Sequence, residues 1–122
     1  MPTWTPDELD SLDRTQEIRV AGRKQDGSLR TLTIVWHVVV DGALYVRSYK
    51  GADGQWYKGV LRNLAGAVSW GGQTRDVTYI PDDAHDEDVD AAYFAKYGDT
   101  GPTRAMVAPS AVATTLRVEP AA

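Results

Sequence analysis

Alternating and β-branched hydrophobic positions in the first half of the chain predict β-strands. Residues 17–23 alternate between polar and apolar side chains, and residues 29–40 form a long β-branched run. Asp41-Gly42 follows this run directly and is a strong signal for a two-residue hairpin turn. We therefore expect residues 43–49 to return antiparallel to residues 29–40.

The long run is apolar on both of its faces. One face carries Leu32, Ile34, Trp36, Val38 and Val40, and the other carries Val35, His37 and Val39. A strand of this kind is covered on both sides, and a second subunit is one candidate for one of the covers. Because a lone histidine in a strand is more often packed or hydrogen-bonded than catalytic, we expect a structural role for His37.

Glycine-containing corners divide the rest of the β-rich region. Gln25-Asp26-Gly27 predicts a hairpin turn, Ala65-Gly66 a turn into a strand over residues 67–70, and Gly71-Gly72 a further turn. Residues 73–80 alternate again and complete this hairpin, and residues 113–119 form the last strand. Residues 56–63 are compatible with a short helix or a strand.

Two helices are expected outside these strands. Thr5 as N-cap, Pro6 at the first helical position and Glu8 three residues after the cap predict a helix over residues 6–13. Trp4 is placed to contact Leu9 as a hydrophobic staple. The second helix is indicated by Val89, Tyr93 and Tyr97 at helical spacing, with Lys96 in its last turn and Gly98 just beyond its end.

These elements predict a mainly β fold with short helices. About six antiparallel strands in 122 residues suggest a closed or partly split barrel, because closing a sheet removes its exposed edges. The length is that of one domain over residues 1–122, with the barrel spanning residues 17–119.

Composition excludes several kinds of chemistry. The chain has no cysteine, which rules out disulfides, thiolate-bound metals and a cysteine nucleophile. Its first residues lack the features of a secretory signal, and no apolar run approaches the roughly 20 residues of a membrane span. We expect a cytoplasmic protein of bacterial type. The acidic residues at positions 82–90 are better explained by the dipole of the helix that follows than by a metal, so no metal site is predicted.

Charge is distributed unevenly along the chain. The net charge is −4, yet residues 14–75 contain ten Lys or Arg against four Asp or Glu. The negative net charge of the protein argues against nucleic acid as a partner. The basic segment over residues 14–75 suits a small anionic ligand such as a phosphate. The alternative is that the acidic flanks fold back and pair with these cations.

Cations, glycines and aromatic residues gather within residues 21–59. Pairing through Asp41-Gly42 is expected to place Arg30 and Thr31 opposite residues 47–50, so that Arg47 and Lys50 converge with them. Gly51 and Gly54 would let backbone amides approach an anion. Trp56 and Tyr57 offer flat surfaces for a planar ring. Phosphate at one end and a flat heterocycle at the other outline a flavin nucleotide.

Four segments carry a family resemblance: GRKQDGSLR at residues 22–30, VRSYKG at 46–51, WY at 56–57 and ATTLRVEP at 113–120. In this order the chain resembles the FMN-binding split-barrel superfamily, and within it a bacterial family of uncharacterised small proteins and the deazaflavin-dependent nitroreductases. The resemblance covers roughly residues 22–120.

The resemblance implies a homodimer with two cofactor sites, each at the subunit interface, for FMN or a deazaflavin. By position, Arg23, Lys24, Arg30 and Thr31 would face the phosphate or acidic tail of the cofactor. Ser48, Lys50 and Gly51 would hold the phosphate or the ring edge, and Trp56 and Tyr57 would lie beside the isoalloxazine. No catalytic residue is singled out.

Three functions remain open at this point. The first is an oxidoreductase whose flavin or deazaflavin passes a hydride to a small organic substrate, chemistry that needs no triad of side chains. The second is a module that binds a cofactor or another small ligand without turnover. The third is a structural dimeric barrel that has lost the cofactor.

Overall fold

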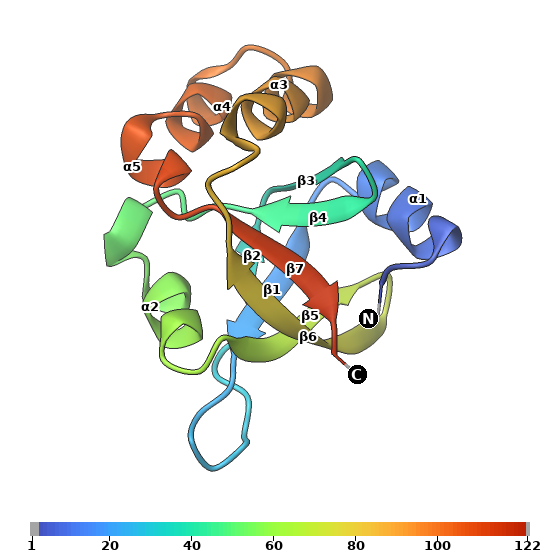
Figure 1. Ribbon diagram of the computed structural model, residues 1–122, viewed down its shortest axis with the longest axis vertical. Helices are drawn as coiled ribbons and strands as arrows, with labels where there is room; N and C mark the ends of the chain where they lie inside the picture. Colours follow the sequence, from blue (N-terminus) through green and yellow to red (C-terminus); the bar gives the residue numbers. More distant parts are fainter. Residues whose placement is uncertain (1–2, 122) are drawn as a thin grey trace.

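The protein is described by a computed structural model over residues 3–121, which contains a strongly curved sheet and five short helices (Figure 1). The strands are β1 Ile18–Gly22, β2 Thr33–Val35, β3 His37–Val40, β4 Ala43–Val46, β5 Ala65–Trp70, β6 Gln73–Pro81 and β7 Leu116–Pro120. The helices are α1 Pro6–Arg14, α2 Gln55–Leu61, α3 Asp86–Tyr97, α4 Gly101–Met106 and α5 Pro109–Val112, and a 3-10 turn spans Gly51–Asp53.

The sheet closes almost completely on itself. Its order is β2-β1-β5-β6-β7-β4-β3, and all the pairings are antiparallel. The two edge strands, β2 and β3, follow one another along the chain and are separated only by Trp36. One stretch of chain therefore pairs with β1 in its first half and with β4 in its second half, which confirms the expected mainly β barrel.

The path of residues 29–40 corrects two expectations. Residues 29–40 do not form one strand, so the sheet has seven strands where about six were expected. The pairing of His37 with Val46 also places residues 33–36, rather than Arg30 and Thr31, nearest to residues 47–50. The expected register was wrong because the turn at Asp41-Gly42 pairs Val40 with Ala43, and this register, continued, already sets residues 33–36 opposite residues 47–50.

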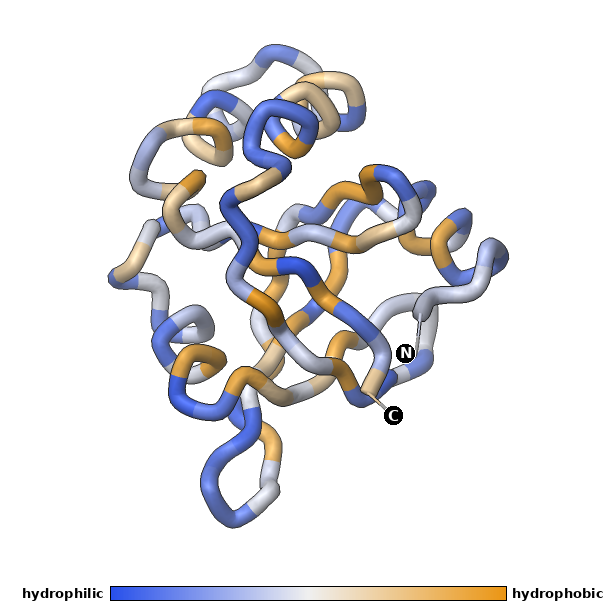
Figure 2. The backbone as a smooth tube through the Cα atoms, in the orientation of Figure 1, coloured by the Kyte–Doolittle hydropathy of each residue, from blue (hydrophilic) through white to orange (hydrophobic). Residues whose placement is uncertain are grey.

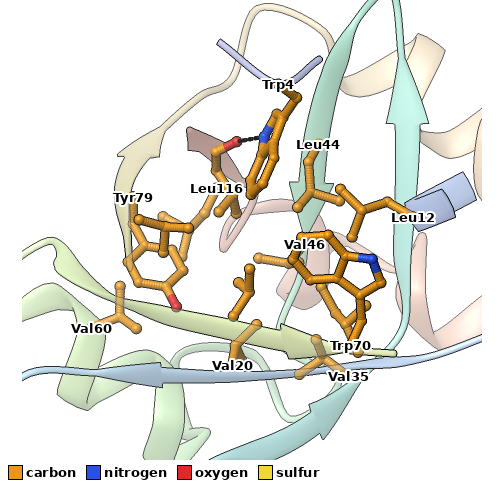
Figure 3. Close-up of a cluster of buried hydrophobic side chains, with 14 of the residues drawn as sticks. Trp4, Leu12, Val20, Val35, Leu44, Val46, Val60, Trp70, Tyr79 and Leu116 are labelled. Carbon is orange, nitrogen blue, oxygen red and sulfur yellow. Dashed lines mark hydrogen bonds between the residues drawn. The ribbon is translucent and has the colours of Figure 1, made fainter. Parts of the chain in front are cut away.

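The barrel interior holds the main hydrophobic core (Figure 3). Trp4 enters it from the N-terminal segment and donates from Nε1 to the Val118 carbonyl oxygen at 2.7 Å. Tyr79 is buried, and its hydroxyl donates to the carbonyl oxygens of Ala21 and Ala67 at 2.9 and 3.1 Å. These bonds satisfy two large aromatic side chains inside an otherwise apolar interior.

A second, smaller core lies between the sheet and the helices α3 and α4. Val38 and Tyr45 of β3 and β4 are buried together with Val89, Tyr93 and Met106 of these helices. Helices of the same chain therefore cover this face of β3, where a second subunit was one candidate. Leu32 and Ile34, further back along the same run, remain 36% and 51% exposed. The hydropathy colouring of Figure 2 shows the apolar stretches of β3 and β4 beneath the helical layer.

Most of the local predictions at turns and caps are confirmed. Thr5 and Glu8 form a reciprocal capping box at the start of α1. The β3–β4 hairpin turns at Asp41 and Gly42 with positive φ values of 49° and 79°, a combination typical of a type I′ turn. The corners at Gly27 and Gly71-Gly72 also form turns, and α3 ends at Gly98 as expected.

The expected turn at Ala65-Gly66 was wrong, because both residues belong to β5. A Cβ atom on Gly66 would overlap the Ala21 carbonyl oxygen, so this glycine serves the close approach of β5 to β1. Of the two alternatives for residues 56–63, the helix is correct. Helices α4 and α5 were not expected from the sequence. Within residues 3–121, no helix has the length and apolar character needed to cross a membrane.

Candidate functional site

Two neighbouring cavities meet at the start of α2 and share the side chains of Ile34, Tyr49 and Trp56. The first, of about 210 Å³, extends toward α4, where Pro102 and Met106 line it. The second, of about 240 Å³, extends over the loop before α2 and is also lined by Thr33, Ser48, Lys50, Gly54 and Gln55. We call them the aromatic cavity and the loop cavity. Trp56 stands between them and offers a flat surface to either.

Ser48 lines the loop cavity, and its hydroxyl is buried beneath Gly54. The residue is only 1% exposed, and its Oγ has no hydrogen-bond partner although it is buried. A Cβ atom on Gly54 would overlap this Oγ, so glycine is needed there for the loop to pass over Ser48. A buried hydroxyl left unpaired costs free energy.

The two glycines of this loop shape the turn but do not present free amides. The Gly51 amide donates to the Ser48 carbonyl oxygen at 2.9 Å, and the Gly54 amide donates to that of Gly51 at 3.1 Å. Gly51 adopts a φ of 65°, which favours glycine. The amides of Gly51 and Gly54 are therefore not free to bind an anion. The loop contributes the side chain of Lys50 instead.

Arg47 is fully buried, and its guanidinium is already engaged. Its Nε donates to Thr115 Oγ1 at 2.8 Å and its Nη1 to the Met106 carbonyl oxygen at 3.1 Å, while Nη1 also pairs with Asp90. It lies 5.6 Å from the ring centre of Tyr93. Arg47 thus ties β4 to the helical layer, and its buried guanidinium is held by partners within the protein.

A third cavity, of about 440 Å³, lies at the other end of α2 and is strongly basic. Its lining residues are Arg23, Gln25, Arg30, Arg62 and Asn63. We call it the arginine cavity. Arg30 lies along α2, where a Cβ atom on Gly59 would come within 2.6 Å of its Cδ, and its buried Nε has no hydrogen-bond partner.

Acidic residues outside positions 14–75 form ion pairs with some of the cations within that range. This pairing was the alternative explanation for the uneven charge. Arg23 pairs with Asp76 at 2.6 Å, Arg47 with Asp90, and Arg75 with Glu8. Within residues 3–121, Arg30, Lys50 and Arg62 form no ion pair. Among the residues that line the loop and arginine cavities, these three are the cations available to an anionic ligand, because Arg23 is paired with Asp76.

The expected site residues thus fall into two groups with α2 between them. Ser48, Lys50 and Trp56 line the loop cavity, whereas Arg23 and Arg30 line the arginine cavity. Lys24 and Thr31 are exposed and line neither of these cavities, and Gly51 is buried beneath the loop. Tyr57 packs into the barrel core, where burial raises the pKa of its hydroxyl, so it does not lie beside a ring in these cavities.

Several further lining residues were not identified from the sequence, among them Glu17, Ile34 and Arg62. Arg62 could have been found once residues 56–63 were treated as a helix, since it then follows the last turn beside the glycine-rich hairpin. Ile34 was assigned to an apolar strand face. No signal in the sequence indicated that this face would be left open.

His37 has the structural role that was expected. It is buried, and its Nε2 lies 2.6 Å from the Leu12 carbonyl oxygen and 3.1 Å from Lys96 Nζ. Burial and the nearby ammonium lower the pKa of His37 to about 4, and burial lowers the pKa of Lys96 to about 8. The pair joins α1 to α3 across β3.

The acidic segment before α3 holds ion pairs within the protein. Asp82 lies 3.2 Å from Arg117 and 3.1 Å from His85, and Asp86 and Asp90 face Arg47. Among residues 3–121 there is no group of three or more carboxylate, histidine or cysteine side chains suited to a metal.

A nearly closed antiparallel barrel with short helices is the architecture of the split-barrel fold. The chain belongs to the bacterial family described as "Uncharacterized protein conserved in bacteria (DUF2255)", whose model matches residues 8–118. A search among curated proteins finds no match.

Solved structures share the fold. The conserved hypothetical protein Rv2991 from Mycobacterium tuberculosis is 17% identical, with 99% of this chain and 82% of that chain covered and a TM-score of 0.63. An FAD-binding protein from Mesorhizobium loti is 20% identical, covering 98% and 91%, with a TM-score of 0.58. An F420 reductase is 18% identical, covering 93% and 92%, with a TM-score of 0.52. These likenesses confirm the expected relation to the FMN-binding split barrels at the level of the fold.

Proposed function

We propose that this protein binds a flavin-type cofactor, FMN or a deazaflavin, along α2 and transfers a hydride to a small organic substrate. The observation that carries the proposal is the composition of the loop cavity, where the flat side chain of Trp56 lies beside Lys50, a cation without an ion pair in residues 3–121. Fold neighbours described as an FAD-binding protein and an F420 reductase support this choice of ligand.

The ring system of the cofactor would lie against Trp56, with Ser48 and Lys50 at its polar edge. Aromatic side chains bind flat heterocycles by stacking, and Ser48 can donate to a carbonyl oxygen or accept from a ring N–H. Lys50 favours negative charge at that edge. Ordering the ring in this way is the task of the protein, whereas the cofactor supplies the redox chemistry.

The phosphate would be held in the arginine cavity by Arg30 and Arg62. Guanidinium groups suit phosphate because they donate two parallel hydrogen bonds. Thr33 lines the loop cavity and Arg30 the arginine cavity. Arg30 and Thr33 are three positions apart, so their Cα atoms are separated by at most roughly 10 Å. The sugar-alcohol chain of a flavin nucleotide can bridge a distance of this size.

A homodimer would complete the site. Leu32, Ile34 and Tyr49 are 36%, 51% and 61% exposed, and the last two line the proposed ring site. Exposed apolar residues grouped beside a ligand site are typical of a surface that is covered by another chain. We therefore place a second copy of the chain over this edge of the barrel.

Isothermal titration calorimetry with FMN and with a deazaflavin tests the proposal. Saturable binding of one of them is expected, weakened about tenfold by Lys50→Ala because one charge-assisted contact is lost. Lys58→Ala is the matched control. Lys58 is an exposed lysine on α2, and it lines none of these three cavities. Failure of the folded wild-type protein to bind either cofactor would overturn the proposal.

A further inference from the structure

The aromatic cavity differs in chemistry from the loop cavity beside it. Three aromatic side chains, Trp36, Tyr49 and Trp56, form much of its wall. Ile34, Val35, Pro102 and Met106 supply the rest of its apolar lining. Trp36 is held in place by stacking on Tyr97, with ring centres 4.0 Å apart and planes within 2°. The result is a mostly apolar compartment of about 210 Å³ with three aromatic side chains in its wall.

The charge of this compartment is negative. Glu17, an exposed residue directly before β1, is the one carboxylate in its lining and forms no ion pair within residues 3–121. Arg47 is the one cation in the lining, but it is paired with Asp90 and faces Asp86 as well. Lys50 lines the neighbouring loop cavity instead. A ligand in the aromatic cavity therefore meets an unpaired carboxylate and no unpaired cation.

We infer that the aromatic cavity takes a planar aromatic cation, with its ring among Trp36, Tyr49 and Trp56 and its positive charge toward Glu17. This inference rests on the proposed function in that it names the class of substrate that would lie beside the cofactor ring. The faces of aromatic rings attract cations, tryptophan most strongly, and several such faces around one carboxylate are a known means of recognising organic cations. An anionic ring would meet Glu17 and the electron-rich ring faces without a compensating donor.

The neighbouring cavities favour ligands of opposite charge. Lys50 and the arginine cavity favour the anionic cofactor, while Glu17 favours a cationic partner on the other side of Trp56. This arrangement also discourages binding in the wrong compartment, because each ligand would meet a like charge there.

Calorimetric titration with three bicyclic probes of similar size tests the inference: N-methylquinolinium chloride as the cation, quinoline as the neutral ring, and quinoline-2-carboxylate as the anion. At near-neutral pH, the cation should bind the wild-type protein about tenfold more tightly than quinoline, and the anion should bind most weakly. Glu17→Gln should reduce the preference for the cation to about twofold, and Glu17→Lys should reverse it in favour of the anion.

Glu87→Gln is the matched control, because it removes the same charge from an exposed position on α3 that does not line the aromatic cavity. It should leave all three affinities unchanged. Equal binding of the cation and quinoline, no binding of any probe, or a preference that survives Glu17→Gln in a folded variant would each overturn the inference.

The outcome is separable from that of the cofactor titration. If flavins fail to bind but the cation binds through Glu17, the redox proposal falls and the cation site stands as a binding site. If a flavin binds and the cation shows no preference, the cofactor site stands and the substrate class is wrong.

Discussion

At the scale of single residues, partners that lie far away in the sequence decide whether a cation is buried in an ion pair or exposed. Arg47 and Lys50 are three positions apart, yet Arg47 is buried with Asp90 while Lys50 is exposed at the loop cavity. The carboxylate that engages Arg47 comes from α3, 43 residues further along the chain. The sequence alone could not separate the two residues, because the difference is made by packing.

Loss of Arg47 should reduce stability strongly. Arg47→Leu leaves Asp90, Thr115 and the Met106 carbonyl oxygen without their partner. Breaking one side of such a buried pair costs about 3 kcal/mol in the free energy of unfolding, measured by urea denaturation. Arg104→Leu is the control, since the pair of Arg104 with Asp99 is exposed and should contribute less than about 1 kcal/mol. Similar losses in both variants would contradict this role for Arg47.

His37 should make stability fall on mild acidification. Its pKa is about 4 in the folded protein against 6.5 in the unfolded chain, so between these values the unfolded chain binds the extra proton. Stability is therefore lost as the pH falls from about 6.5 to about 4, by about 3 kcal/mol in total.

The variant His37→Gln keeps a donor for the Leu12 carbonyl oxygen but cannot titrate. Its unfolding free energy, measured by urea denaturation across this pH range, should show a smaller slope than that of the wild type. Identical slopes in the two proteins would argue against a buried neutral histidine.

At the scale of elements, sequence patterns predicted those parts that depend on local chemistry. The capping box of α1, the Asp41-Gly42 hairpin and the end of α3 at Gly98 each follow from a few adjacent residues. Patterns failed where tertiary contacts decide. Gly66 looked like part of a turn but lies inside β5, and α4 and α5 lack the long periodic pattern that reveals a helix.

The close approach of β5 and β1 at Gly66 should tolerate no side chain. In Gly66→Ala the new Cβ would overlap the backbone oxygen of Ala21, and backbone in a paired strand cannot easily move aside. We expect a loss of at least about 3 kcal/mol, or failure to fold, in thermal and urea denaturation. Gly101→Ala is the control, because a Cβ there meets nothing within 4 Å. A Gly66→Ala variant as stable as Gly101→Ala would show that the strands are further apart.

At the scale of the whole molecule, the barrel class could be predicted from strand number and alternation, but the site could not be predicted in full. Of the predicted site residues, Ser48, Lys50 and Trp56 line the loop cavity and Arg23 and Arg30 the arginine cavity, whereas Arg47 and Tyr57 are buried in the protein. Their division into two cavities follows from α2 lying between them and from the hairpin register, which sets residues 33–36 rather than Arg30 opposite residues 47–50. The position of α2 leaves no local signature in the sequence.

The proposed homodimer can be tested at its exposed apolar edge. Leu32→Asp places a charge on the surface that we assign to the second copy, without altering a residue that lines any of the three cavities. Sedimentation velocity should find the wild type at twice the mass of the chain and this variant at the mass of one chain. Phe94→Asp, on α3 and equally exposed, should remain dimeric. A wild type that sediments as a single chain would contradict the dimer.

The central claim is that one nucleotide spans α2, with its ring beside Trp56 and its phosphate in the arginine cavity. The most direct test compares the affinities of wild type and Arg30→Ala for FMN and for riboflavin, which differ only in the phosphate. The wild type should bind FMN at least about tenfold more tightly than riboflavin, and Arg30→Ala should lose that preference while keeping its affinity for riboflavin. Equal binding of FMN and riboflavin by the wild type, or an FMN preference that Arg30→Ala leaves intact, would contradict the account.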